Sequence, residues 1–346
     1  MKAERALQIA LVLALMAGAF ALGIRFAPDR SSAGLQADQP LIVRSRIMLP
    51  GVFGRIDHFS FDRKRGNLFV AALGNDTVEV VNNLRRIHSI TGLQQPQGVL
   101  YIEEFDRLAV SDRSGKVRFY DGASFGLLKT VDLGGSADNL RYEPEERRVY
   151  VGYGAGAESA IIMFDPVSME RLPQEFKVGS HPESFQFDWK KKRILVNLPD
   201  QEAIGIIDRA TGKVDMWHIE GTKTNHALAL DEDSRRLFSA AIQPGKLWVI
   251  DADSGRVITT LRIVLGVDDL WFDARRKRVL ASGHAGYVSV VEQKGADRYD
   301  VVANVPTGVG GGTSHYVRSR TFEGLFVGLP NTSPAGSEIL FLAVQE

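Results

Sequence analysis

Six polar side chains recur along the chain at nearly even intervals, each directly ahead of a segment in which apolar residues alternate with others. They are Asp57, Gln97, Asp138, Glu183, His226 and Asp268. Four of the six are carboxylates, and His58, Asn139 and Asp269 directly follow Asp57, Asp138 and Asp268. If the fold gathers these positions, the carboxylates repel one another, so a bound cation or shared protons are expected among them.

This set of residues has two chemical interpretations. Carboxylate and amide oxygens are typical ligands of calcium, magnesium and manganese, and the imidazole of His58 or His226 would also admit zinc. The alternative is a solvated rim, because polar residues at strand starts can bond exposed backbone N–H groups. The residues leave both open. We predict a ligand-binding set, with a divalent metal as a candidate cofactor.

A repeat positions these residues and runs from residue 57 to the end of the chain. Each copy is an apolar-x-apolar strand, a polar turn and a second apolar strand, as in HFSFDRKRGNLFVA from His58 and DLWFDARRKRVLAS from Asp269. The equivalent turn positions are Asp62, Ile102, Glu143, Asp188, Asp231, Asp273 and Arg318, with steps of 40, 41, 45, 43, 42 and 45 residues. This period is typical of the four-stranded blade of a β-propeller.

The count of strands predicts how the ring closes. A third and a fourth strand follow in six units, but the seventh unit ends after its third strand, EILFLAV. Residues 41–49 (LIVRSRIML) have the character of a fourth strand and precede the first unit. We therefore predict an all-β, seven-bladed β-propeller over residues 41–346, with its last blade closed by an N-terminal strand.

Closure of such a ring would bring the six polar residues to the mouth of the central channel, where each inner strand begins. The seventh blade would supply Thr313, Ser314 or His315, and we include His315 in the predicted site. His88, His218 and His284 fall in strands or outer turns, so we predict that they are surface or packing residues.

The chain resembles the YVTN-repeat propellers of the YncE-like group. The resemblance rests on LFVAALGNDTVEVVN (residues 68–82) and on the D-x-x-[TS]-G-[KR] turns that begin at Asp208 and Asp251. It covers residues 41–346 and implies the propeller fold. It also implies an exported protein, but it does not imply a particular reaction.

Composition excludes several classes of function. Lys plus Arg equals Asp plus Glu, 42 each, so no basic excess is available to recruit nucleic acid. The chain has no cysteine, which excludes disulfides, thiolate metal sites and a lipoprotein anchor. We expect a monomer whose partner is a small molecule or a protein.

The first residues indicate export. Lys2 and Arg5 precede an apolar run over residues 6–24, and Ala19-Phe20-Ala21 has the small-x-small form of a signal-peptidase site. Residues 1–24 are therefore a signal peptide or an uncleaved signal anchor, because about 20 apolar residues can also span a bilayer. Residues 25–40 are predicted to be a linker. Either alternative makes the protein periplasmic or secreted, and an uncleaved segment would tether it to the membrane.

Three functions remain open. The first is an exported propeller that binds a ligand or partner at an acidic channel mouth. The second is a metal-dependent lactonase, hydrolase or lyase at the same mouth, because Asn139, Glu183 and Asp268 resemble the carboxylate–amide–carboxylate ligand set of propeller lactonases. The third is a structural interaction module. Whether any reaction is catalysed is left open by the sequence.

Overall fold

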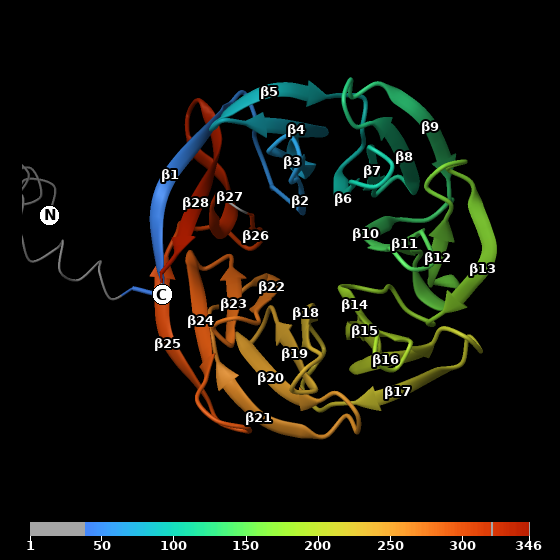
Figure 1. Cartoon of the computed structure of the whole chain (residues 1–346), viewed down its shortest axis with the longest axis vertical. Helices are drawn as coiled ribbons and strands as arrows, with labels where there is room; N and C mark the ends of the chain where they lie inside the picture. Colours follow the sequence, from blue (N-terminus) through green and yellow to red (C-terminus); the bar gives the residue numbers. More distant parts are fainter. Residues whose placement is uncertain (1–38, 320, 346) are drawn as a thin grey trace, which may run out of the picture. The chain divides into compact units, whose positions relative to one another are not determined.

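The computed structural model describes residues 39–319 and 321–345, which form seven four-stranded antiparallel sheets. The first strands of the blades lie innermost around the axis (Figure 1). They are β2 (Phe59–Asp62), β6 (Pro96–Ile102), β10 (Ala137–Glu143), β14 (Phe185–Asp188), β18 (Asn225–Asp231), β22 (Val267–Asp273) and β26 (Ser314–Arg318). The seven-bladed propeller predicted from the repeat is therefore confirmed.

The remaining strands follow outward in each blade. The second strands are β3 (Asn67–Ala72), β7 (Arg107–Asp112), β11 (Arg148–Tyr153), β15 (Arg193–Leu198), β19 (Arg236–Ala241), β23 (Arg278–Gly283) and β27 (Glu323–Ser333). The third strands are β4 (Thr77–Asn82), β8 (Lys116–Asp121), β12 (Ala160–Phe164), β16 (Ala203–Asp208), β20 (Lys246–Asp251), β24 (Tyr287–Gln293) and β28 (Gly336–Val344). The outermost strands are β5 (Arg85–Ile90), β9 (Leu127–Asp132), β13 (Arg171–Lys177), β17 (Val214–His218), β21 (Val257–Arg262), β25 (Tyr299–Pro306) and β1 (Leu41–Pro50).

The ring closes through the last blade, as predicted. Strand β1 pairs antiparallel with β28, from Leu41 opposite Val344 to Pro50 opposite Gly336. The blue first strand accordingly lies beside the red last hairpin in Figure 1. Ile47 and Leu49 are fully buried, whereas the intervening Met48 is 45% exposed, as expected of a strand with one covered face.

Apolar contacts between neighbouring blades form the core. The middle strands are buried on both faces; every residue of β3, for example, is buried. Phe69 of the first blade stacks on Tyr101 of the second with ring centroids 5.6 Å apart, and Phe238 stacks on Phe272 in the same way at 5.4 Å. These stacked aromatic contacts between neighbouring blades hold the inner strands at fixed distances from the channel axis.

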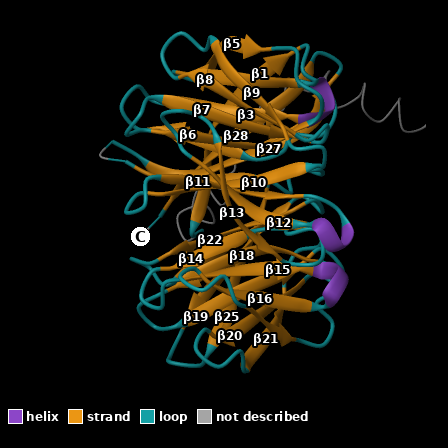
Figure 2. Cartoon of the chain, turned by 90° about the vertical axis from the view of Figure 1, so that its right-hand side faces the viewer, coloured by secondary structure: helices purple, strands orange, loops and turns teal. Residues whose placement is uncertain are grey.

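Ion pairs at the turns after the inner strands also join neighbouring blades. The guanidinium of Arg65 donates to Asp62 of its own blade at 3.1 Å and to Asp106 of the next blade at 2.9 Å. Arg235 binds Asp188 of the preceding blade at 2.7 Å. The opposite edge of the blades carries the linkers into the inner strands. It also carries three short 3-10 turns, η1 (Leu73–Asn75), η2 (Gly156–Glu158) and η3 (Pro199–Gln201), which follow second strands and lie along one side in Figure 2.

The predicted export segment, residues 1–24, and nearly all of the linker lie outside the described residues. Residues from Pro40 onward form one compact unit. In the part of the chain that the structure describes, no helix is long and apolar enough to cross a membrane.

Candidate functional site

The described residues enclose two chambers along the central channel. The outer chamber, about 340 Å³, lies where the inner strands begin. Of the predicted residues, its lining includes His58, Gln97, Asp138, Glu183, His226 and Asp268. Asp57 does not line this chamber but is buried beside it, 3.9 Å from the imidazole of His58. Residues separated by more than 200 positions in sequence therefore meet at one place.

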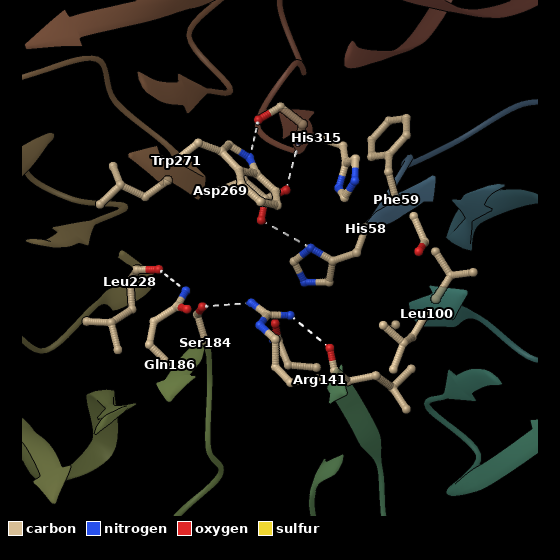
Figure 3. A pocket seen from close by; sticks show the side chains of 17 residues that line it. His58, Phe59, Leu100, Arg141, Ser184, Gln186, Leu228, Asp269, Trp271 and His315 are labelled. Carbon is tan, nitrogen blue, oxygen red and sulfur yellow. Dashed lines mark hydrogen bonds and ion pairs between the residues drawn. The ribbon is translucent and has the colours of Figure 1, made fainter. Parts of the chain in front are cut away.

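The inner chamber, about 280 Å³, lies deeper between the same strands (Figure 3). It receives the other predicted residues, Asn139, Asp269 and His315. His58 lines both chambers, and its Nδ1 lies 3.3 Å from Asp269. Burial alone would lower the pKa of His58, but the charge of Asp269 raises it to about 10, so the imidazole is protonated at neutral pH. The contact between His58 and Asp269 lies where the two chambers adjoin.

Asp138 of the outer chamber has three polar side chains around it. It accepts a hydrogen bond from the amide of Gln97 at 2.9 Å, and the Nε2 atoms of His181 and His58 lie 3.8 and 3.7 Å away. Burial works against its ionisation, but the contact with His181 and the charge of His58 hold its pKa below the usual range. The oxygen facing His58, Oδ1, is buried and has no hydrogen-bond donor.

Asp268 is the second ionised carboxylate. It binds the guanidinium of Arg55 at 2.9 Å and lies 3.6 Å from Nε2 of His284. Burial opposes its charge, yet the contact with His284 and the charge of Arg55 hold its pKa well below the usual range. The same contact with Asp268 raises the pKa of His284. Asp268 therefore has basic partners, Arg55 and His284, that stabilise its ionised form.

Glu183 and Asp57 are the two carboxyls of this region whose pKa values are raised. Burial and the nearby charge of Asp138 raise the pKa of Glu183 to about 8. Its nearest basic partner is His226, with Nδ1 at 3.5 Å, and burial lowers the pKa of that imidazole, which therefore stays neutral near pH 7. Burial also raises the pKa of Asp57 to about 7 despite the charges of His58 and Arg55. These two carboxyls hold protons at pH values where free carboxyls have lost them.

The inner chamber combines a positive charge with apolar walls. Arg141 of β10 projects into it, and Figure 3 shows the aromatic rings of Phe59 and Trp271 around the same space. His315 packs edge-on against Trp271 with centroids 4.9 Å apart, and burial lowers its pKa to about 4. His315 is therefore neutral over the physiological range.

A glycine permits the close approach of the second and third blades beside the site. A Cβ atom at Gly98 would lie 2.2 Å from the backbone oxygen of Asp138. The same oxygen accepts a hydrogen bond from the hydroxyl of Ser111. Any residue with a Cβ atom at position 98 would clash with the backbone of Asp138 and displace it.

The predicted metal ligands do not share one chamber. Asn139 lines the inner chamber, whereas Glu183 and Asp268 line the outer one. Among the described residues, no three His, Asp or Glu side chains form a group that could hold a metal ion. Binding of a divalent metal stays a prediction.

Sequence analysis missed four basic residues of the outer chamber: Arg55, Arg113, His181 and His284. His284, which we predicted to be a surface or packing residue, lines the outer chamber with its side chain 37% exposed. Arg55 and His181 lie two positions ahead of Asp57 and Glu183, and this spacing could have found them, because alternate residues of an extended segment face the same way. Arg113 and His284 directly follow the equivalent second strands β7 and β23, a position that the search for inner-strand residues did not consider.

Comparisons with known proteins support the fold alone. No family model and no curated protein matches the sequence. The structure is similar to the crystal structure of the RRP9 WD40 repeats, with a TM-score of 0.71 and 11% identity over 88% of this chain and 99% of that one. A chain in the crystal structure of the mitotic checkpoint complex gives a TM-score of 0.71 and 13% identity, over 88% of this chain and 92% of that one. The chain is a seven-bladed β-propeller with a WD40-like architecture.

Proposed function

We propose that the protein is an exported propeller of the YVTN-repeat kind that binds a ligand bearing a cationic group in its outer chamber. The observation that carries this proposal is that Asp138, with one buried oxygen that has no hydrogen-bond donor, and Glu183, with a raised pKa, line the same cavity of about 340 Å³. A cavity of this size corresponds to roughly eleven water molecules at about 30 Å³ each, so it is large enough for an organic ammonium or guanidinium group.

The hydrogen-bond pattern supports a donor-rich ligand. Oδ1 of Asp138, a residue that lines the chamber, is buried without a hydrogen-bond donor. Leaving buried acceptors unsatisfied is costly, so a ligand that supplies N–H donors relieves that cost on binding. A cationic group near Glu183 would also favour the ionised carboxylate, and the proton would be released as the ligand binds.

Titration calorimetry with agmatine and putrescine tests this proposal, with 1,4-butanediol as the neutral counterpart. We expect saturable binding of the amines and none of the diol. Asp138→Asn and Glu183→Gln should each weaken binding by about tenfold or more, because each removes a charged acceptor. Glu220→Gln, an exposed change outside the chamber, is the matched control. If amines and diol bind alike, or if no amine binds, the proposal is wrong.

The cationic group can also belong to a protein. The similar checkpoint chain comes from a structure of a complex. A lysine or arginine of a partner inserted at the mouth would meet the same carboxyls. Competition between agmatine and a captured partner would identify the outer chamber as the shared site, whereas independent binding would place the partner elsewhere on the propeller.

A second candidate function follows from the Glu183–His226 pair. A carboxyl with a raised pKa lies 3.5 Å from an imidazole with a lowered pKa, and such a pair can act as general acid and general base. This arrangement would serve a hydrolase, lactonase or lyase. Metal analysis of protein purified without chelator, followed by a lactone-hydrolysis screen, tests it. Turnover that survives in His226→Ala would exclude this pair as the catalytic groups.

A further inference from the structure

The inner chamber contains the positive charge of Arg141, which has no ion-pair partner among the described residues that line it. Arg141 donates from one terminal nitrogen to the backbone oxygen of Leu140 at 2.9 Å and from the other to the hydroxyl of Ser184 at 3.4 Å. Both acceptors are neutral, and the guanidinium forms no ion pair with any described carboxylate. A guanidinium has five N–H donors, so most of them have no acceptor among the residues that the structure describes.

The nearest acidic residue is already engaged. One oxygen of Asp269 pairs with Nδ1 of His58 at 3.3 Å, and the other accepts a hydrogen bond from the backbone N–H of Ser314 at 2.8 Å. Burial lowers the pKa of Arg141, although the charges of Asp269 and Asp138 act in the opposite direction. Arg141 is only partly buried, and it lines the chamber, where a ligand can reach its guanidinium.

A second donor lies on the same strand. Asn139 precedes Arg141 by two positions on β10, and both side chains line the inner chamber. Asn139 is only 3% exposed, and its amide forms no hydrogen bond with a described residue. Phe59, Leu100 and Trp271 give the same chamber an apolar lining (Figure 3).

We propose that the inner chamber is a binding subsite for a small organic carboxylate. Arg141 donates two parallel hydrogen bonds to the planar carboxylate, the geometry for which a guanidinium is suited, and Asn139 supplies a further donor. The aromatic and aliphatic wall covers the organic remainder. This inference goes beyond the proposed function and does not depend on it, because it uses none of the carboxyls of the outer chamber.

Titration calorimetry with acetate and benzoate tests the subsite, with acetamide and benzamide as neutral counterparts. We expect at least one carboxylate to bind with a Kd of about 1 mM or tighter and its amide to bind at least about tenfold more weakly. Arg141→Met should weaken carboxylate binding by about tenfold to a hundredfold. Arg44→Met, an exposed change on β1, is the control and should leave binding unchanged. Equal affinity for acids and amides, or no binding of either acid, would overturn the proposal.

Ser184→Asp provides a second test that does not depend on the choice of probe. The hydroxyl of Ser184 lies 3.4 Å from the guanidinium, so an aspartate there would supply the missing anion from within the protein. We expect a higher midpoint of thermal unfolding and loss of carboxylate binding. A lower midpoint in Ser184→Asp, together with a lower midpoint in Arg141→Met, would show that Arg141 is structural. Amine binding in the outer chamber, measured on the same variants, reports separately on the proposed function.

Discussion

Replacement of Glu183 by glutamine should make the protein less sensitive to pH. The side chain is 19% exposed and its pKa is about 8, against an ordinary value of 4.5. Above pH 4.5 the unfolded chain releases this proton while the folded chain keeps it. Stability contributed by the protonated carboxyl is therefore fully present below pH 4.5 and is lost as the pH rises toward 8.

The size of the effect follows from the shift in pKa. Each unit corresponds to about 1.4 kcal/mol, so a rise from about pH 5 to about pH 7.5 would cost the parent up to roughly 3 kcal/mol at this one group. Because neighbouring groups titrate in the same range, we expect on the order of 2 kcal/mol. Glutamine has no proton to lose and should not show this cost.

Urea unfolding followed by tryptophan fluorescence at several pH values measures the difference. The free energy of unfolding of Glu183→Gln minus that of the parent should increase by on the order of 2 kcal/mol between about pH 5 and about pH 7.5. The exposed Glu220→Gln should show a difference that does not change with pH. A flat or falling difference for Glu183→Gln would refute the claim that this carboxyl holds its proton in the folded chamber.

Three further predictions concern closure, blade contact and export. Ile47→Ala on the closing strand should lower the free energy of unfolding by about 2 to 5 kcal/mol, whereas the exposed Met48→Ala should change it little; equal effects would contradict closure by β1. Gly98→Ala should lower the thermal midpoint because its Cβ would lie 2.2 Å from a backbone oxygen, and Gly295→Ala, with nothing nearer than 3.9 Å, is the control. A reporter fused after the propeller should be active outside the cytoplasm, and N-terminal sequencing should separate cleavage after Ala21 from an intact anchor; activity confined to the cytoplasm would contradict export.

The fold could be predicted because it rests on local patterns that repeat. Alternating strands at a spacing of 40 to 45 residues define the blades, and the missing fourth strand of the seventh unit identifies the closing strand. The start of each inner strand is part of the same repeat. The meeting of Asp57, Asp138 and Asp268 around one mouth could therefore be predicted without any knowledge of their distances.

The balance of charge could not be predicted in this way. From the sequence, Asp138 and Glu183 are equivalent carboxylates, but in the structure Asp138 faces His58 and His181 while Glu183 faces a neutral His226. Spacing can place Arg55 and His181 at the mouth, but which carboxylate each basic residue approaches depends on tertiary contacts between blades. The role of Arg141 could not be predicted either, because the sequence does not show whether an arginine within a strand will form an ion pair with a carboxylate.

The central claim is that a cationic group takes the place of a proton in the outer chamber. It can be tested by titrating agmatine into the protein at about pH 7.5 in two buffers with different enthalpies of ionisation, which reports the protons released on binding. We predict proton release by the parent protein and substantially less by Glu183→Gln, together with weaker binding. Binding heats that are the same in both buffers, or equal proton release by the parent and the variant, would contradict the account.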